Sequence, residues 1–239
     1  MPLNEFCRTE LLVGEEGIAK LHNSKVIVFG IGGVGSFVVE ALTRAGVGNL
    51  ILVDNDTICI SNINRQIHAR QSTVGMIKVE AMKERVISIN PNCNVEAKQV
   101  FITAENISEI IPSDVDYVVD AIDTVTSKLA LAEYCYKNNI NIISSMGTGN
   151  KIDPTQFRVL DVFKTKVCPL AKVMRYELRK RGVKKLKVVY SEEMPMTPDK
   201  GRAVPSQKRQ TPGSISFVPP VAGMIIGGEV IKDLTGLNK

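Results

Sequence analysis

The sequence VIVFGIGGVG, which begins at Val26, places four glycines directly after an apolar stretch. None of these residues can make or break a covalent bond. Glycines at Gly30, Gly32, Gly33 and Gly35 let the chain turn sharply into a helix, so that a phosphate can approach the free N–H groups of the helix N-terminus. Asp54 ends the next apolar stretch, 19 residues after Gly35, where its carboxylate can accept hydrogen bonds from a ribose. This spacing predicts a nucleotide site without specifying the nucleotide.

A second group of polar residues is not what a hydride-transfer enzyme needs. Asn62, Arg65 and Lys78 follow Asp54 along the chain and could surround a polyphosphate. Arg65 can bind two phosphate oxygens through its planar fork, while Lys78 supplies a point charge. Asp123 follows a further apolar stretch, and a carboxylate near two cations and a nucleotide can hold Mg²⁺. Each residue alone could form an ordinary surface ion pair, but the set in this order indicates cleavage of a triphosphate.

Alternating apolar and amphipathic segments predict the elements that position these residues. The pattern is typical of a Rossmann-like, doubly wound and mainly parallel sheet with helices on both faces. We expect strands over 25–30, 49–54, 94–100, 115–121 and 140–146, and helices over 9–23, 35–45, 75–90 and within 121–139. Ser61 is expected to cap a short helix that runs through the segment NINRQI.

The pattern changes after Gly149. Apolar and polar residues alternate in segments 155–163 and 186–192, as they do in antiparallel strands, and a basic amphipathic helix is expected between these segments. Cys168 precedes this helix, either as an N-cap or as a reactive thiol with a lowered pKa. A long charged, proline-rich loop is expected over 193–212, followed by a short strand and a helix that returns to the core. We therefore expect one domain over 1–239, with a nucleotide-binding half (1–150) and a basic, substrate-facing half (151–239).

Composition and charge narrow the class of protein. The formal net charge is +5, yet residues 164–209 hold 14 Lys and Arg against 4 Asp and Glu. This asymmetry indicates a phosphate-rich partner for the C-terminal third, unless the basic residues only form a solvated face. No apolar run is long enough to span a membrane and no signal-peptide pattern begins the chain, so we expect a cytoplasmic protein without a membrane partner.

Four segments together carry a resemblance to a known family. GIGGVG, LVDNDTICISNINRQ, VGMIKVEAMKERVISINP and DAIDT are similar to the nucleotide site of the MoeB/ThiF/ubiquitin-activating superfamily. Members of that superfamily adenylate a carboxylate with Mg-ATP and release pyrophosphate. The resemblance implies ATP and Mg²⁺ as cofactors and a homodimer in which one chain completes the site of the other. It implies these roles: Asp54 and Asp56 on the nucleotide with Asp54 at the ribose, Asn62, Arg65 and Lys78 on the phosphates, Asp123 on the magnesium side, and Arg8 in the partner subunit's site.

The acid that is adenylated is indicated by the second half of the chain. Superfamily members that activate sulfur carriers usually hold two C-x-x-C pairs, and this chain has none among its five cysteines. The segments CPLAKVMRYELRKRG, VVYSEE and GSISFVPPVAGMIIGGEVIKDLTG resemble the tRNA threonylcarbamoyladenosine dehydratase branch instead. That branch activates the threonyl carboxylate of the modified adenosine, after which the neighbouring carbamoyl nitrogen closes a five-membered ring. The resemblance implies tRNA as a partner, and we expect Arg175, Arg179, Lys184 and Lys185 to contact its phosphates.

Two other functions stay open at this point. The first is a sulfur-carrier adenylyltransferase of the MoeB/ThiF type, and docking of a sulfur-relay protein belongs to the same question. The second is an NAD-binding redox protein. The missing cysteine pairs count against the first function, and the set Asn62, Arg65, Lys78 and Asp123 counts against the second.

Overall fold

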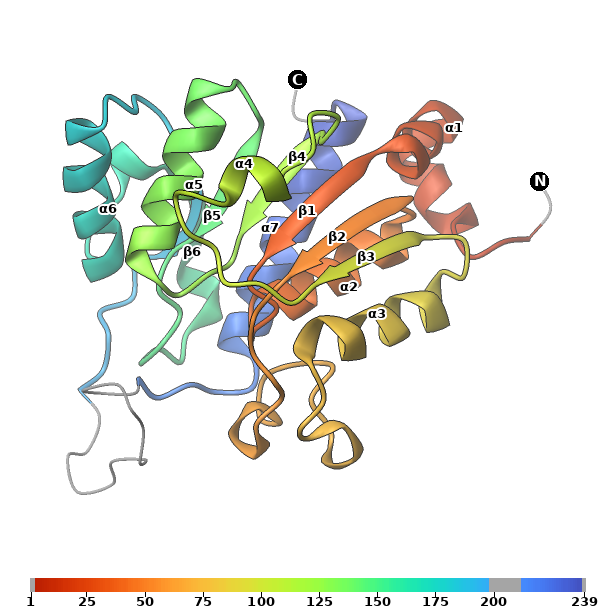
Figure 1. The fold of residues 1–239 in the computed structure, drawn as a ribbon, viewed down its shortest axis with the longest axis horizontal. Helices are drawn as coiled ribbons and strands as arrows, with labels where there is room; N and C mark the ends of the chain where they lie inside the picture. Colours follow the sequence, from red (N-terminus) through yellow and green to blue (C-terminus); the bar gives the residue numbers. More distant parts are fainter. Residues whose placement is uncertain (1–2, 198–211, 238–239) are drawn as a thin grey trace.

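The sheet that carries the site has seven strands in the order β3-β2-β1-β4-β5-β7-β6 (Figure 1). The fold comes from a computed structural model, which describes residues 3–197 and 212–237. All neighbouring strands pair in parallel except β6 and β7, which are antiparallel, so the predicted fold class is confirmed. The strands are β1 (Lys25–Phe29), β2 (Asn49–Val53), β3 (Asn94–Lys98), β4 (Tyr117–Asp120), β5 (Ile142–Ser145), β6 (Phe157–Asp161) and β7 (Lys187–Ser191).

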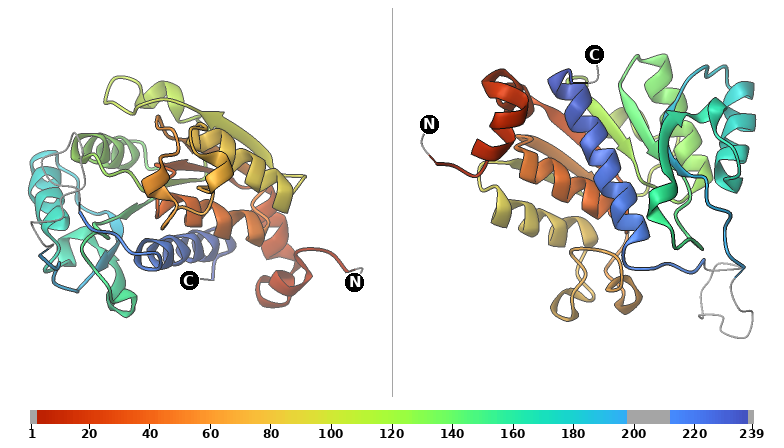
Figure 2. Two further views of the ribbon diagram at one scale, coloured as in Figure 1. Left: turned by 90° about the horizontal axis from the view of Figure 1, so that it is seen from below. Right: turned by 180° about the vertical axis from the view of Figure 1, so that it is seen from behind.

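Helices cover both faces of this sheet, as its two apolar faces require (Figure 2). Helices α1, α2, α3 and α7 contribute to the core on one face, while α4 and α5 pack against the other and α6 packs beside α5. The helices are α1 (Cys7–Asn23), α2 (Gly35–Ala45), α3 (Lys78–Ile89), α4 (Ile107–Ile110), α5 (Val125–Lys137), α6 (Pro169–Lys180) and α7 (Val218–Thr235).

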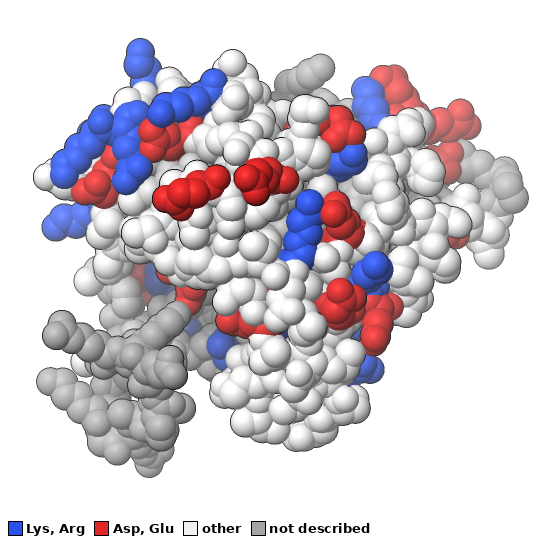
Figure 3. Space-filling view, in the orientation of Figure 1, with Lys and Arg blue, Asp and Glu red and all other residues white. Residues whose placement is uncertain are grey.

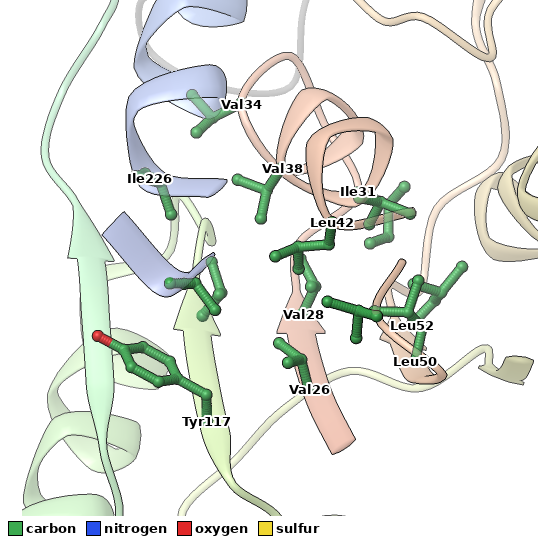
Figure 4. Packing of buried hydrophobic residues seen from close by; sticks show 14 of the residues in the cluster. Val26, Val28, Ile31, Val34, Val38, Leu42, Leu50, Leu52, Tyr117 and Ile226 are labelled. Carbon is green, nitrogen blue, oxygen red and sulfur yellow. The ribbon is translucent and has the colours of Figure 1, made fainter. Parts of the chain in front are cut away.

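The core follows from the two-residue period of the central strands. In β1, Val26 and Val28 point to the face covered by α2 and α7, whereas Ile27 and Phe29 point to the opposite face. All four side chains are fully buried, and Figure 4 shows Val28 packed near Val38 and Leu42 of α2. Each such side chain contributes about 1.5–3 kcal/mol through the apolar surface it removes from water. The core therefore holds rigidly the strand ends at which the polar residues lie.

Three local expectations differ from the structure. Ser61 does not cap a helix: the short 3₁₀-helix Ile60–Asn62 begins after Cys59, and Ser61 lies inside it. The short strand expected before the last helix is absent, because residues 212–217 run as irregular chain up to Val218. The first helix is kinked at Gly14, which has a φ of 74° and interrupts the helical backbone. Most of the loop expected over 193–212 lies outside the described residues.

Candidate functional site

The turn between β1 and α2 needs glycine at two positions for steric reasons. Gly30 has a φ of 85°, and a Cβ there would lie 2.6 Å from the carbonyl oxygen of Ala121, which directly follows β4. A Cβ on Gly35 would lie 1.8 Å from the carbonyl oxygen of Gly30. The turn can therefore close only with glycines, and it brings the first turn of α2 to the carboxyl edge of the sheet.

A cavity of about 710 Å³ opens at this edge of the sheet. It lies where the carboxyl ends of β1, β2 and β4 meet, so one space collects residues that are far apart in the sequence. Among the residues expected to bind the nucleotide, it is lined by Gly30, Gly32, Gly33, Asp54, Asp56, Asn62, Arg65, Lys78 and Asp123. Gly35 and Arg8 do not line it.

Asp54 is fixed by the backbone on both of its carboxylate oxygens. Oδ2 accepts a hydrogen bond from the N–H of Ile31 at 2.6 Å, and Oδ1 accepts one from the N–H of Asp56 at 2.9 Å. Burial raises the pKa of Asp54, and the positive charge of Lys78 opposes that shift. Because each carboxylate oxygen has a second lone pair, Asp54 can still accept hydrogen bonds from a ribose.

Lys78 begins α3 and is almost completely buried at the cavity wall. Its Nζ lies 2.6 Å from Asp56 Oδ2 and 3.8 Å from Asp54 Oδ1. The side chain of Asp56 is 59% exposed, so its carboxylate is solvated and can move away from Lys78. A phosphate that enters the cavity can therefore take the place of Asp56 on Lys78 at small cost. In the structure, Asp56 contacts the lysine that is expected to bind the phosphates.

Arg65 is a half-buried cation whose partners are neutral. Its Nη1 donates to the carbonyl oxygen of Ser61 at 3.0 Å and to Asn64 Oδ1 at 2.8 Å. Within residues 3–197 and 212–237, no carboxylate forms an ion pair with Arg65. Burial accordingly lowers the pKa of Arg65 without making the side chain neutral. An uncompensated guanidinium at a cavity wall is suited to bind an anion.

Two buried charges support the turn that precedes Asp123. Lys128 of α5 and Asp120 at the end of β4 are both fully buried, and Nζ lies 2.9 Å from Oδ2. The same ammonium donates to the carbonyl oxygen of Ile122 at 3.2 Å, and Ser144 donates to Asp120 Oδ2 at 2.6 Å. These bonds fix the turn that precedes Asp123. Removing one partner of such a pair would leave an uncompensated charge in the interior.

Arg8 lies at the other edge of the sheet in its own chain. It is exposed near the start of α1, whose preceding residue Phe6 packs against Gly46 beyond the end of α2. Because α2 runs from the cavity to the amino edge of the sheet, this position is remote from the cavity (Figure 1). Arg8 can therefore serve a site of this kind only in a second copy of the chain.

Several residues that line the cavity were not predicted from the sequence. Gln66 lines the cavity beside Arg65 and is 6% exposed, and its Oε1 has no hydrogen-bond partner in the part of the chain that the structure describes. Phe101 and Ile102 follow β3, so the rule that ligands meet the carboxyl ends of parallel strands could have identified them. A further part of the cavity is lined by residues 145–149, Leu170, Pro212 and Pro219, to which no local sequence signal pointed.

The basic part of the chain forms an outer surface over α6. Figure 3 shows Lys and Arg side chains gathered in this region, at the upper left. Arg179, Lys184 and Lys185 are exposed, whereas Arg175 is half-buried and donates to Thr165 Oγ1 at 2.5 Å. Cys168 precedes α6 as expected, but its side chain makes no capping hydrogen bond and is only 2% exposed.

A mainly parallel sheet, a glycine turn and a cavity with two cations and three carboxylates are the features of a nucleotide-binding α/β protein. The model of the ThiF family matches residues 6–239, and the chain belongs to this family. The resemblance stated from the sequence is thereby confirmed.

Similar proteins carry more specific names. The tRNA threonylcarbamoyladenosine dehydratase of Bacillus subtilis (strain 168) is 47% identical over 241 residues, which cover 97% of this chain and 95% of that protein. The crystal structure of the E. coli tRNA N6-threonylcarbamoyladenosine dehydratase TcdA with AMP superposes with a TM-score of 0.89 at 36% identity, over 98% of this chain and 95% of that one. Its complex with ATP gives a TM-score of 0.88 at 35% identity, with the same coverage of both chains.

Proposed function

We propose that the chain catalyses the ATP-dependent dehydration of threonylcarbamoyladenosine in tRNA. The observation that carries this proposal is the cavity in which Arg65, Lys78 and Asp123 join the glycine turn and Asp54. Two kinds of relative support it: the B. subtilis protein and E. coli TcdA bear the name of this activity, and TcdA has been crystallised with AMP and with ATP. The family's chemistry then assigns a role to each cavity residue.

The reaction needs two substitutions that together remove one water. The threonyl carboxylate attacks the α-phosphorus of ATP, and the bond to pyrophosphate breaks. The carbamoyl nitrogen of the same nucleoside then attacks the activated acyl carbon, which closes the ring and releases AMP. The nucleophile of the second step is part of the substrate, so proximity supplies much of the acceleration and no enzyme thiol is needed.

The chain's own residues stabilise the charges that develop in the first step. Asp54 holds the ribose, Lys78 neutralises the α-phosphate after exchanging Asp56 for it, and Arg65 binds the phosphates that leave as pyrophosphate. Asn62 Oδ1 already accepts from the N–H of Cys59 at 3.0 Å, so its amide N–H groups are the donors that a phosphate can use. Preorganised donors of this kind act without reorganisation during the reaction.

The donor set of the cavity fits Mg²⁺. The described residues contain no group of three or more His, Cys, Asp or Glu side chains that could hold a metal ion by themselves. Mg²⁺ in nucleotide sites usually needs only one or two carboxylates, because phosphates and waters complete its shell. Asp123 lines the cavity and would hold the ion, which neutralises phosphate charge when bound.

The part of the cavity between residues 145–149, Leu170 and Pro219 is the proposed place for the modified nucleoside. It adjoins the start of α6, so a tRNA bound there would extend over the basic surface of that helix.

No helix among residues 3–197 and 212–237 is long and apolar enough to cross a membrane. We propose tRNA as the macromolecular substrate, as the names of the similar proteins suggest, and the cytoplasm as the location expected from the sequence. Docking of a sulfur-relay protein stays a prediction of the resemblance.

Neutralising the basic surface is expected to weaken tRNA binding. In a variant with Arg175, Arg179, Lys184 and Lys185 replaced by alanine, tRNA affinity should fall while ATP affinity stays unchanged. Three of these residues are exposed, so the slope of log affinity against log salt should flatten by roughly 2–3. Titrations at several salt concentrations measure the slope. A variant with Lys20, Lys83 and Lys98 replaced by alanine, away from α6, is the control, and an unaltered slope in the first variant would make the basic surface a solvated face only.

A homodimer is proposed to complete each site. Leu11 and Leu12 of α1 are 80% and 81% exposed, and they lie three and four residues after Arg8 on the same helical face. Apolar side chains of this size rarely gather at a surface that stays in water. If a second copy of the chain covers Leu11 and Leu12, Arg8 of each chain lies close to the other chain.

Arg8 is accordingly expected to act in trans. Arg8→Ala and Lys78→Met chains should each be inactive alone, because each homodimer lacks one group in both sites. In a mixed dimer both defects fall in one site and the other site is intact, so pyrophosphate release should return after the two chains are exchanged. If mixing restores no activity beyond that of the separate variants, Arg8 acts within its own chain or has no role in the reaction.

The alternative functions are tested by the substrate that stimulates pyrophosphate release. With Mg-ATP, release should require tRNA that contains threonylcarbamoyladenosine. A small sulfur-carrier protein with a C-terminal glycine should not stimulate release. Stimulation by the carrier and not by tRNA would overturn the proposal in favour of the adenylyltransferase. Tight binding of NAD without binding of ATP in calorimetry would favour the redox protein.

A further inference from the structure

Asn150 connects Met196 and Gly213 through three hydrogen bonds. Its backbone N–H donates to the carbonyl oxygen of Gly213 at 2.8 Å, and its side-chain Oδ1 accepts from the N–H of Gly213 at 2.6 Å. Its carbonyl oxygen accepts from the N–H of Met196 at 2.7 Å. Asn150 has a φ of 57°, a left-handed conformation that asparagine tolerates better than most residues. One residue thus fixes Met196 and Gly213 side by side.

This contact lies at the edge of the cavity. Asn150 follows Gly149, which lines the cavity together with Pro212. The two residues are closely packed, since a Cβ on Gly149 would lie 2.8 Å from Cβ of Pro212. The chain entering α7 is therefore held at a defined position at the cavity wall, although it has no regular secondary structure there.

Asn64 continues the connection to the phosphate-binding arginine. Its Nδ2 donates to the carbonyl oxygen of Ser214 at 2.9 Å, and its Oδ1 accepts from Nη1 of Arg65 at 2.8 Å. Ser214 directly follows the residue that Asn150 holds. Asn64, Asn150, Gly213 and Ser214 thus form one asparagine network, which ends on the guanidinium of Arg65.

We propose that Asn64 and Asn150 are positioning residues, which hold the Arg65 guanidinium in place for the outer phosphates of ATP. The proposal deepens the proposed function, because it rests on the binding of ATP in this cavity. Neither asparagine lines the cavity, so each acts through Arg65.

The physical reason is the freedom of an arginine that has no acidic partner among the described residues. A long side chain loses rotamer entropy when a ligand immobilises it, and that loss weakens binding unless the protein has already ordered the side chain. The stem of Arg65 packs close to the glycine turn, because a Cβ on Gly33 would lie 3.2 Å from its Cγ. The asparagine network orders its other end with neutral groups, so the positive charge stays available for phosphate.

The test compares ATP with AMP, because AMP lacks the phosphates that Arg65 is proposed to bind. Asn64→Ala removes both side-chain bonds of Asn64, and Asn150→Gly keeps the left-handed backbone while removing the side-chain bond to Gly213. Each variant should bind ATP about fivefold to tenfold more weakly in calorimetry, the effect of one lost hydrogen bond. Binding of AMP should stay within about twofold of wild type in both variants.

Two further variants separate positioning from general structural damage. Asn150→Asp keeps an acceptor for Gly213 and tolerates the same backbone conformation, so it should restore ATP binding. Asn139→Gly makes the matched substitution at another left-handed asparagine, with a φ of 54°, away from the ATP cavity, and should leave ATP binding unchanged. The double variant Asn64→Ala/Asn150→Gly should lose no more ATP affinity than the weaker-binding single variant, because both changes break one connection.

The results distinguish this inference from the proposed function. If wild type binds ATP and both single variants bind it equally well, or if ATP and AMP affinities fall together, the inference is overturned and the proposed function stands. If the ATP-selective loss is found but wild type does not dehydrate the tRNA nucleoside, the inference stands and the proposed function fails.

Discussion

Replacing Lys78 by methionine is expected to lower kcat for pyrophosphate release by about 10²–10³-fold, the usual cost of removing one preorganised hydrogen-bond donor from a charged transition state. Lys78 is the buried cation nearest to Asp54, and its present partner Asp56 is exposed. Methionine has a similar length, so the change removes charge with little change in volume. Steady-state release of pyrophosphate with saturating tRNA measures the effect.

Lys83→Met provides the control for this prediction. Lys83 lies on the same helix α3, is only partly buried and does not line the cavity. It should retain activity close to that of wild type. Activity of Lys78→Met within a few-fold of Lys83→Met would contradict the assignment of Lys78 to the α-phosphate.

Replacing Asp123 by asparagine is expected to lower the rate of pyrophosphate release strongly while the fold is kept. The substitution preserves volume and removes the negative charge that the magnesium side of the site needs. The turn before it stays supported by Lys128 and Asp120, so the thermal midpoint should change little. We expect a loss of about 10²–10³-fold in kcat, measured over a series of Mg²⁺ concentrations.

Asp114→Asn is the matched control for Asp123→Asn. Asp114 precedes the same strand β4 at the opposite edge of the sheet, where its carboxylate pairs with Lys25 on the surface. The hydrogen bond from Lys25 lowers the pKa of Asp114, and a smaller effect of desolvation opposes this shift. Loss of the Asp114 carboxylate should leave kcat for pyrophosphate release unchanged. Near-normal release of pyrophosphate by Asp123→Asn would show that Asp123 does not serve the metal side of the site.

The parts of the site that were predictable from the sequence are those encoded locally. The glycine turn and Asp54 belong to one strand–helix–strand unit with a fixed spacing, and the chain has little freedom to place them elsewhere. The antiparallel pair β6 and β7 followed from alternation in 155–163 and 186–192, and pairing of these segments confirms it. Gathering of Arg65, Lys78 and Asp123 in one cavity follows from the common carboxyl edge of the parallel strands.

The remaining features depend on contacts between distant residues. Asn64 and Ser214 are 150 positions apart and meet through a single hydrogen bond, for which composition and periodicity give no signal. The short strand expected before α7 is missing because residues 213–214 are bound by the side chain of Asn64 and by the side chain and backbone N–H of Asn150, rather than by a neighbouring strand. Cys59 rather than Ser61 precedes the 3₁₀-helix because the side chain of Asn62 accepts from the N–H of Cys59 and fixes that start.

The most direct test of the proposed function is mass analysis of nucleosides from tRNA that has been incubated with the protein and Mg-ATP. The tRNA must contain threonylcarbamoyladenosine at the start, and Lys78→Met protein serves as the control. The proposed function predicts that this nucleoside is replaced by a product lighter by one water, in step with the release of AMP. Unchanged threonylcarbamoyladenosine with the wild-type protein, under conditions in which the protein binds ATP, would contradict it.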